Sequence, residues 1–448
     1  MKKEFNERSF ALFAINTVVG FGFIATIVDV VKLGYWGILI FAVTAFIAIT
    51  TALVFSRLVN AFNEDKGGSV AYAQRTGKKY LTFFMFFNQY IQSPIFMASG
   101  PLFLVKIAEQ FTQEETILWI VRVASVIFFL VIILLSTFKL KTSKFLIFAS
   151  AAIKWIILAL GFGGLIYLVI KQPATAMQNI DDAKKVSAYL IFSNIIFFMF
   201  AFGGIEVVPN LANEVKFKNF KKVMIFSILI ITSIYILGYV LLINTDLQKN
   251  GSFVNIYKNS MGVFGLVMFG LYLLFYNFSF TMTISITYPK ALVKFAEEGY
   301  LPKYLTKTNK HNQHKNAIWT NAILIIVSMV IFTLIPVIFK LDGSAFNIVI
   351  KVGTIAFLLQ YLLTYICALI LAKQNKIAKI PLYEKIMYYL AIFIITITTL
   401  VYFLPFLVNQ SWSVNNTIIL VTYVGLFIVA NIFYYWYQHV NKKVKNTN

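Results

Sequence analysis

Charged residues are scarce in this sequence, and their scarcity argues against a soluble protein. Only 12% of the 448 residues are charged and 60% are hydrophobic, whereas an average soluble domain has about 25% charged residues. A soluble core cannot cover that much apolar surface. Runs of about 20 uncharged residues, the length that a membrane-spanning helix needs, recur along the chain. The sequence therefore predicts an integral membrane protein.

Cysteine and histidine are also rare. The single cysteine, Cys367, lies in an apolar run, so no disulfide can form within the chain. His311 and His314 stand among lysines at a spacing that does not make a metal site, and neither a nucleophile nor a phosphate-binding loop stands out. We therefore expect no metal, no cofactor and no enzyme activity.

The apolar runs predict twelve membrane crossings. The first begins at Phe10 and is too long for the apolar core of a cleaved signal peptide, so we expect it to remain as helix one. Residues 386–440 are too many for one crossing, but Pro405 and the polar residues 409–416 divide them into two. The other runs are 34–56, 80–105, 123–138, 145–170, 186–205, 223–245, 262–289, 316–339 and 352–372.

Acidic residues are outnumbered by basic ones, 17 to 39, which gives a formal charge of +22. With the N-terminus in the cytoplasm and the crossings alternating, the lysine clusters at 139–144, 303–315 and 373–385 fall on the cytoplasmic side. This is the positive-inside pattern, and it places both termini in the cytoplasm. Basic loops beside anionic lipid headgroups explain the charge, so we expect no nucleic-acid partner. The heavy use of Lys, Ile, Asn and Phe is typical of a bacterium with an AT-rich genome.

Two of the predicted helices contain glycines near their middle. Gly20 and Gly22 lie in helix one, where they either break the helix or allow close packing against a neighbour. Gly203 and Gly204 lie in helix six and are followed by Glu206. Adjacent glycines weaken a helix by about 1 kcal/mol each relative to alanine, and an ionisable group at membrane depth is costly unless it faces protein or water. An interior site at these breaks is therefore expected.

Breaks in helices one and six predict two inverted five-helix repeats, because interrupted segments at matching places in two halves mark the binding site of a secondary transporter. The repeats would span 10–172 and 186–373, followed by helices eleven and twelve at 385–438, with cytoplasmic ends at 1–9 and 439–448. The amides freed at Gly20, Phe21 and Gly22 would hold a carboxylate. The carbonyls freed near Val18, Phe200 and Gly203 would accept from an ammonium.

Four motifs in register resemble the amino acid, polyamine and organocation permease superfamily. They are the VVGFGFI segment around Gly20, the GGSVAYAQRTG segment at 67–77, the FAFGGIE segment at 200–206 and the YPKALVKFAEEGYLP segment at 288–302. The resemblance implies an all-α, leucine-transporter-like fold with alternating access to a central amino acid site, in which the residues matching Phe200 cover the substrate. Phe21 departs from the family, where a small or hydroxyl residue commonly stands between the glycines. Val70 replaces an expected aromatic residue, and a usual proline after helix six is absent.

Lys154 is the only charge in predicted helix five. It either snorkels to the cytoplasmic headgroups or faces the core beside the break of helix one. The resemblance supports the core position, because many proton-coupled members carry a lysine there. We therefore predict that Lys154 is the proton-coupling residue. For Glu206, two roles stay open: a structural acceptor for the amides freed at Gly203 and Gly204, or a group that gates or carries a proton, with Gly204 as a helix-break residue.

The function expected from these features is secondary active transport of amino acids across the plasma membrane, as proton-coupled uptake. An exchanger is the alternative, since polar residues 88–94 of helix three weakly resemble those of glutamate and GABA exchangers. A transport-inactive amino acid sensor is a second alternative. A channel is disfavoured because no repeated filter or ring of like residues is evident. The expected partners are an amino acid, protons and the lipid bilayer.

Overall fold

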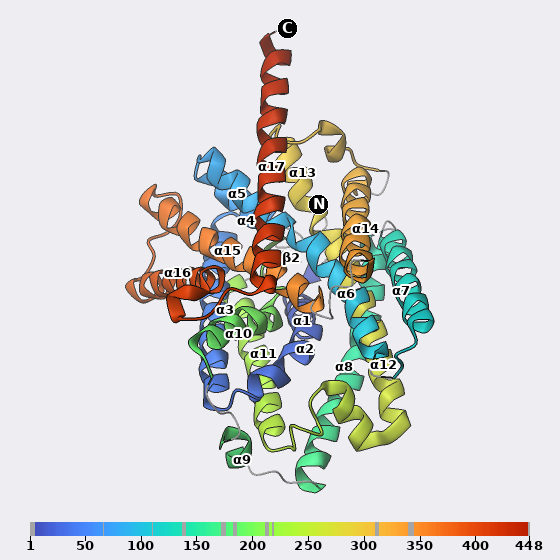
Figure 1. The fold of residues 1–448 in the computed structure, drawn as a ribbon. Coiled ribbons are helices and arrows are strands. Elements are labelled where there is room, and N and C mark those ends of the chain that lie inside the picture. Colours follow the sequence, from blue (N-terminus) through green and yellow to red (C-terminus); the bar gives the residue numbers. More distant parts are fainter. Residues whose placement is uncertain are drawn as a thin grey trace.

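A computed structural model of the chain describes residues 5–65, 67–109, 111–136, 140–171, 176–181, 186–210, 215–216, 219–309, 313–338 and 345–446. These residues are almost entirely helical (Figure 1). The elements of the first half are α1 (Glu7–Val18), α2 (Phe21–Val31), α3 (Tyr35–Ala61), α4 (Ser69–Arg75), α5 (Lys79–Tyr90), α6 (Gln92–Ala108), α7 (Glu115–Ser136), α8 (Leu140–Lys171) and α9 (Ala176–Asp181).

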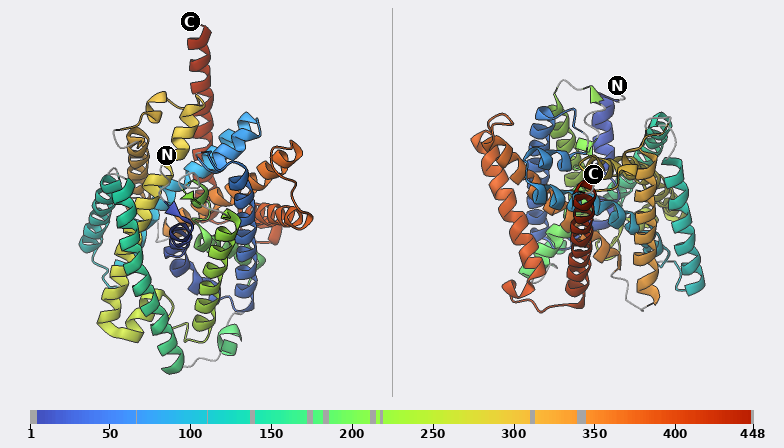
Figure 2. Two further views of the ribbon diagram at one scale, coloured as in Figure 1. Left: turned by 180° about the vertical axis from the view of Figure 1, so that it is seen from behind. Right: turned by 90° about the horizontal axis from the view of Figure 1, so that it is seen from above.

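The second half begins with the sixth predicted crossing. Its elements are α10 (Ala188–Met199), η1 (Phe200–Phe202), α11 (Phe220–Ile243), α12 (Phe253–Thr287), α13 (Pro289–Glu297), η3 (Lys303–Thr306), α14 (Lys315–Ile338), α15 (Ala345–Lys373), α16 (Leu382–Phe403), η4 (Pro405–Val408) and α17 (Val414–Asn446). Helices α16 and α17 lie at the edge of the bundle, and α17 projects beyond it (Figures 1 and 2).

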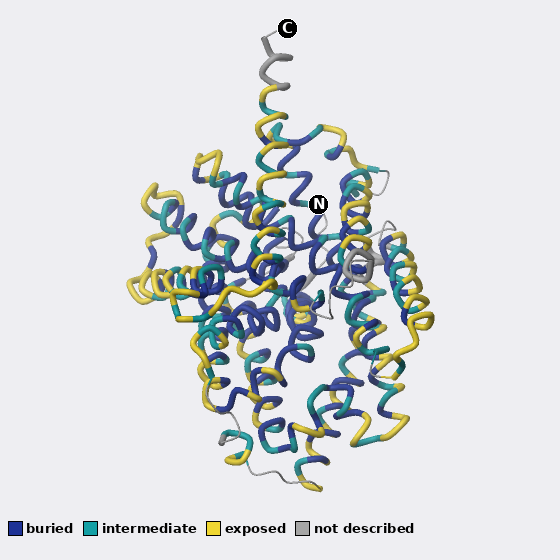
Figure 3. The backbone as a smooth tube through the Cα atoms, in the orientation of Figure 1, coloured by how far each residue is buried: buried dark blue, intermediate teal, exposed yellow. Residues whose placement is uncertain are grey.

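The structure confirms an all-helical membrane protein. Within the described residues, ten helices are long and apolar enough to cross a membrane, and the bent pair α1 and α2 makes an eleventh. The shorter apolar helix Ala188–Phe202 begins the remaining predicted crossing. Exposed positions lie mainly on the outer faces of the helices (Figure 3), and many of them carry large apolar side chains, which identifies lipid as their solvent. Examples are Ile120, Phe145, Ile156, Val263, Ile323, Phe393 and Val429.

Helices one and six are interrupted at the predicted glycines. Helix α1 ends at Val18 and α2 begins at Phe21, with their axes bent by 49°. In helix six, the regular turns end at Phe202, and Gly204 has a φ of +110°. A Cβ atom at Gly22 would lie 2.5 Å from the carbonyl oxygen of Phe200, so the two breaks face each other across a contact too close for a side chain.

A short strand pair joins the start of the chain to the connection between helices six and seven, and no sequence feature predicted it. Strand β1 (Phe5–Asn6) precedes helix one and pairs in parallel with β2 (Val215–Lys216), which follows the break of helix six. A side-chain oxygen of Glu7 accepts a hydrogen bond from the backbone N–H of Asn219 at 2.9 Å. The N-terminal segment is therefore attached to the connection between helices six and seven.

Gly204 provides a test of the facing breaks. We expect Gly204→Ala to destabilise the protein by about 1–3 kcal/mol, because a side chain is strained at a positive φ. Its Cβ would also lie 2.9 Å from the carbonyl oxygen of Thr17 on α1. Thermal unfolding of the purified protein in detergent measures the loss.

Gly163→Ala is the matched control. Gly163 lies within α8, and a Cβ atom there meets nothing within 4 Å. Alanine in a helix interior should be neutral or stabilise by about 0.5–1 kcal/mol. Equal unfolding temperatures for the two variants would contradict the geometry described for Gly204.

Candidate functional site

Lys154 of α8 lies inside the break of helix one. Its ammonium nitrogen donates to the backbone oxygens of Asn16, at 3.0 Å, and Val19, at 2.8 Å. The side chain does not reach toward headgroups, since Lys154 is only 1% exposed. These carbonyls lack helical partners because α1 stops at Val18, and the Lys154 amine supplies the donor that each of them needs. Lys154 therefore takes the second of the two predicted positions, facing the core.

Tyr235 of α11 contacts the ends of both broken helices. Its hydroxyl donates to the backbone oxygen of Ala201, at 2.6 Å, and lies 3.4 Å from that of Val18. The ring stacks on Phe23 of α2 with 4.4 Å between centroids, so its direction is fixed. Tyr235 is not among the site residues predicted from the sequence. A tyrosine in the middle of an apolar helix was the available signal, because a buried phenol needs a hydrogen-bond partner.

Glu206 closes the break of helix six. Both carboxylate oxygens accept from the backbone N–H of Gly204, at 2.9 and 3.0 Å. One of them also accepts from the hydroxyl of Tyr361 on α15 at 2.6 Å. The residue is 3% exposed. The carboxylate therefore satisfies an amide freed by the break and connects it to a neighbouring helix.

The amide end of the helix-one break is surrounded by aromatic rings. The N-cap residue Gly20 supplies no side-chain hydrogen bond to the first turn of α2. The Phe21 ring lies 4.2 Å from that of Phe103 and 5.7 Å from those of Tyr276 and Phe346, between centroids. The ring of Phe200 lies 6.1 Å away. Phe21 is thus the centre of an apolar cluster beside the predicted carboxylate site.

A small polar cavity lies on the lysine side of helix one. Its lining comes from α1, α8 and α12 and comprises Asn16, Thr17, Lys154, Tyr276, Ser279, Phe280 and Thr283. The amide of Asn16 donates to the hydroxyl of Ser279 at 3.2 Å, while its carbonyl oxygen Oδ1 is buried with no partner among the described residues. Of the predicted site residues, only Lys154 lines this cavity.

The polar residues of helix three do not line this cavity. Gln89 donates to the carbonyl of Gly67 and accepts from the amide of Val70, so it holds the glycine loop after helix two. Gln92 donates to the side chain of Gln360 on α15 at 2.6 Å and accepts from the hydroxyl of Tyr288 at 3.1 Å. These groups join helices three, eight and ten in a buried network.

Comparison with known proteins agrees with this architecture. The sequence pattern of the amino acid permease family matches residues 5–429 of this chain. The chain belongs to the amino acid permease family. Membership implies a membrane transporter of amino acids rather than an enzyme, and the match covers both helix breaks, Lys154 and Tyr235.

Relatives of this permease occur in Mycoplasma and span its whole length. The uncharacterized protein MG225 of Mycoplasma genitalium is 26% identical over 100% of this chain and 98% of its own. The uncharacterized protein MG226 of the same species is 27% identical over 98% of this chain and 96% of its own length. Its homolog in Mycoplasma pneumoniae is 26% identical over 99% and 96%. These relatives indicate a bacterial protein and name no substrate.

Removing the Tyr235 hydroxyl tests whether its hydrogen bond to Ala201 stabilises the permease. We expect Tyr235→Phe to destabilise the protein by about 1–3 kcal/mol, because the buried carbonyl of Ala201 loses its donor. The measurement is the unfolding temperature of the purified protein.

Tyr272→Phe is the control for this change. Tyr272 is equally buried, but its hydroxyl has no partner among the described residues. Its removal should leave stability unchanged or raise it. If Tyr235→Phe were as stable as Tyr272→Phe, the hydrogen bond to Ala201 would not contribute.

Proposed function

We propose that this permease is a secondary active transporter that takes up amino acids with protons by alternating access. The observation that carries the proposal is the pair of facing helix breaks with a lysine ammonium bound inside one of them. In this proposal, the backbone amides and carbonyls freed at the two breaks bind the substrate, and the lysine couples binding to a proton. Placement of both termini in the cytoplasm of a bacterial cell is part of the proposal.

The broken helices offer two complementary ends to an α-amino acid. In the proposed complex, the amides of Gly20, Phe21 and Gly22 at the positive end of α2 hold the substrate carboxylate. Carbonyls of Val18, Phe200 and Gly203 accept from the substrate ammonium. The Phe21 cluster must then rearrange around the substrate side chain, with the ring of Phe200 covering it. Backbone groups read what all amino acids share, so the family site suits several side chains.

Lys154 supplies the proposed coupling. A charged ammonium has three N–H groups and holds the Asn16 and Val19 carbonyls by charge-assisted hydrogen bonds, which are about twice as strong as neutral ones. Loss of the proton weakens that hold on the end of α1. Movement of α1 and protonation of Lys154 are therefore linked, and the cavity beside Lys154 gives water or a proton a place next to the nitrogen.

Uptake into proteoliposomes tests the function. Purified protein should accumulate at least one radiolabelled amino acid from a panel, and an inward proton gradient should increase the initial rate. Counterflow without any gradient dependence would instead identify an exchanger. Specific binding of amino acids with no flux would identify a sensor, and neither binding nor flux of any amino acid would reject the proposal.

Replacing Lys154 tests the coupling. We expect Lys154→Ala to lose the dependence of uptake on the proton gradient and to retain at most about a tenth of the gradient-driven rate, which corresponds to a cost of about 1.4 kcal/mol or more. Lys351→Ala is the control. That lysine lies on α15 and donates to Ser193 instead of the helix-one break, so its loss should leave the gradient dependence intact. Full gradient dependence in Lys154→Ala would disprove the role of Lys154.

Replacing Glu206 separates its two roles. Glutamine keeps a carbonyl acceptor for the Gly204 amide but cannot exchange a proton at physiological pH. We expect Glu206→Gln to retain at least half of the uptake rate with an unchanged pH profile, as a structural acceptor should. A flat pH profile in this variant, with normal yield of folded protein, would assign proton transfer to Glu206 instead.

A further inference from the structure

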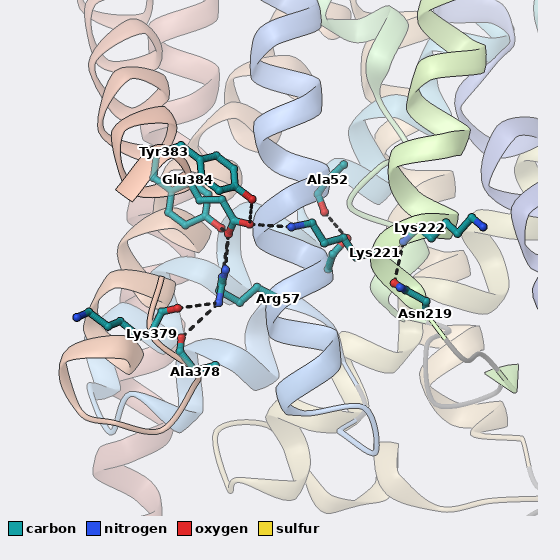
Figure 4. A network of polar contacts seen from close by, with 11 residues as sticks. Ala52, Arg57, Asn219, Lys221, Lys222, Ala378, Lys379, Tyr383 and Glu384 are labelled. Carbon is teal, nitrogen blue, oxygen red and sulfur yellow. Dashed lines mark hydrogen bonds and ion pairs between the residues drawn. The ribbon is translucent and has the colours of Figure 1, made fainter. Parts of the chain in front are cut away.

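A buried cluster of charges outside the proposed substrate site connects three helices. Glu384 of α16 accepts from Arg57 of α3 at 2.6 and 3.0 Å and from Lys221 of α11 at 2.9 Å. Figure 4 shows both cations pointing at the carboxylate from different sides. All three residues lie near the ends of their helices, and Lys221 is two residues from Asn219, which donates to Glu7 at the start of α1.

The burial of these groups is unequal. The Glu384 side chain is 1% exposed, whereas those of Arg57 and Lys221 are 15% and 43% exposed. A carboxylate withdrawn this far from water is strongly destabilised when its cations leave, unless other donors replace them. The two cations stand closer to water and can be hydrated at lower cost when they separate from it.

Other donors to Glu384 come from its own helix. The hydroxyls of Tyr383 and Tyr388 lie 3.1 and 3.3 Å from its two oxygens. Because both tyrosines belong to α16, they stay with Glu384 if that helix separates from α3 and α11. The carboxylate therefore keeps two donors after the cations leave, which lowers the free-energy cost of the separation.

The cations belong to helices that pack around the break of helix one. Helix α11 packs against α1 and α3, and it carries Tyr235 at the broken ends. Helix α16 packs against α10, α15 and α3 at the edge of the bundle. A tilt of α1 that carries α3 and α11 with it would thus pull Arg57 and Lys221 away from Glu384.

We propose that Arg57, Lys221 and Glu384 form an ionic latch that holds α3 and α11 against α16 and opens when these helices move apart. The latch goes beyond substrate binding, since it makes α16, the eleventh predicted crossing, part of the conformational change. The latch lowers the free energy of the closed arrangement, in which α3 and α11 lie against α16. Its removal therefore raises the population of the open arrangement, in which they have moved apart.

Distance measurements between two spin labels test the latch without any substrate. Asn60→Cys near the end of α3 and Leu382→Cys at the start of α16 place labels at exposed positions, in a background where the buried Cys367 is replaced by alanine. Pulsed electron paramagnetic resonance in nanodiscs gives the distribution of distances. The unaltered latch should give mainly the short distance, and Glu384→Gln should raise the ratio of a longer to the short distance about tenfold.

The adjacent lysines of α11 provide a matched pair. Lys221→Gln removes one arm of the latch and should raise the same ratio about threefold. Lys222→Gln removes the same charge one residue away, and Figure 4 shows this side chain pointing away from Glu384. It should leave the distribution unchanged. Identical distributions in Lys221→Gln and Lys222→Gln would overturn the latch, and this comparison still decides the question if Glu384→Gln fails to fold.

Discussion

The rest of this structure depends on the need to satisfy backbone groups that two broken helices expose inside a membrane. A helix that stops at Val18 leaves carbonyls without partners, and hydrocarbon offers none. Lys154 takes those of Asn16 and Val19, while Tyr235 takes that of Ala201 and approaches that of Val18. Glu206 accepts from the freed amide of Gly204. Three side chains from three places in the sequence therefore stabilise the same pair of breaks.

This arrangement connects the chemistry of the site to the movement of the helices. The groups proposed to bind an amino acid belong to the same helix ends that the lysine and the tyrosine hold, so a substrate must share or replace some of these contacts. Phe21 adds an apolar cluster at the amide end. Tyr276 belongs both to this cluster and to the lining of the cavity beside Lys154, so the two regions adjoin. The proposed carboxylate site and the proposed proton-coupling residue are thus both adjacent to the break of helix one.

Outside the site, polar contacts concentrate where separate helices must be kept in register. The amides of Gln92 and Gln360 join α6 and α15. The proposed latch around Glu384 joins α16 to α3 and α11. Strand β1 attaches the N-terminal segment to the connection after helix six. Apolar packing against lipid cannot select one helix arrangement over another, because lipid and side chains are equally apolar, so these directional contacts supply the specificity.

The sequence by itself determined the membrane class, the crossings and the positions of both helix breaks. These depend on composition and on glycines within apolar runs, which are local properties. It also restricted Lys154 to two positions, because a lone charge in an apolar helix must either reach headgroups or find partners in the protein. Only the tertiary structure decided between them, and only it brought Tyr235 to the broken ends. Arg57 and Glu384 are 327 residues apart, and no periodicity predicts their contact. Such pairings depend on how the helices pack, and packing is a property of the whole chain.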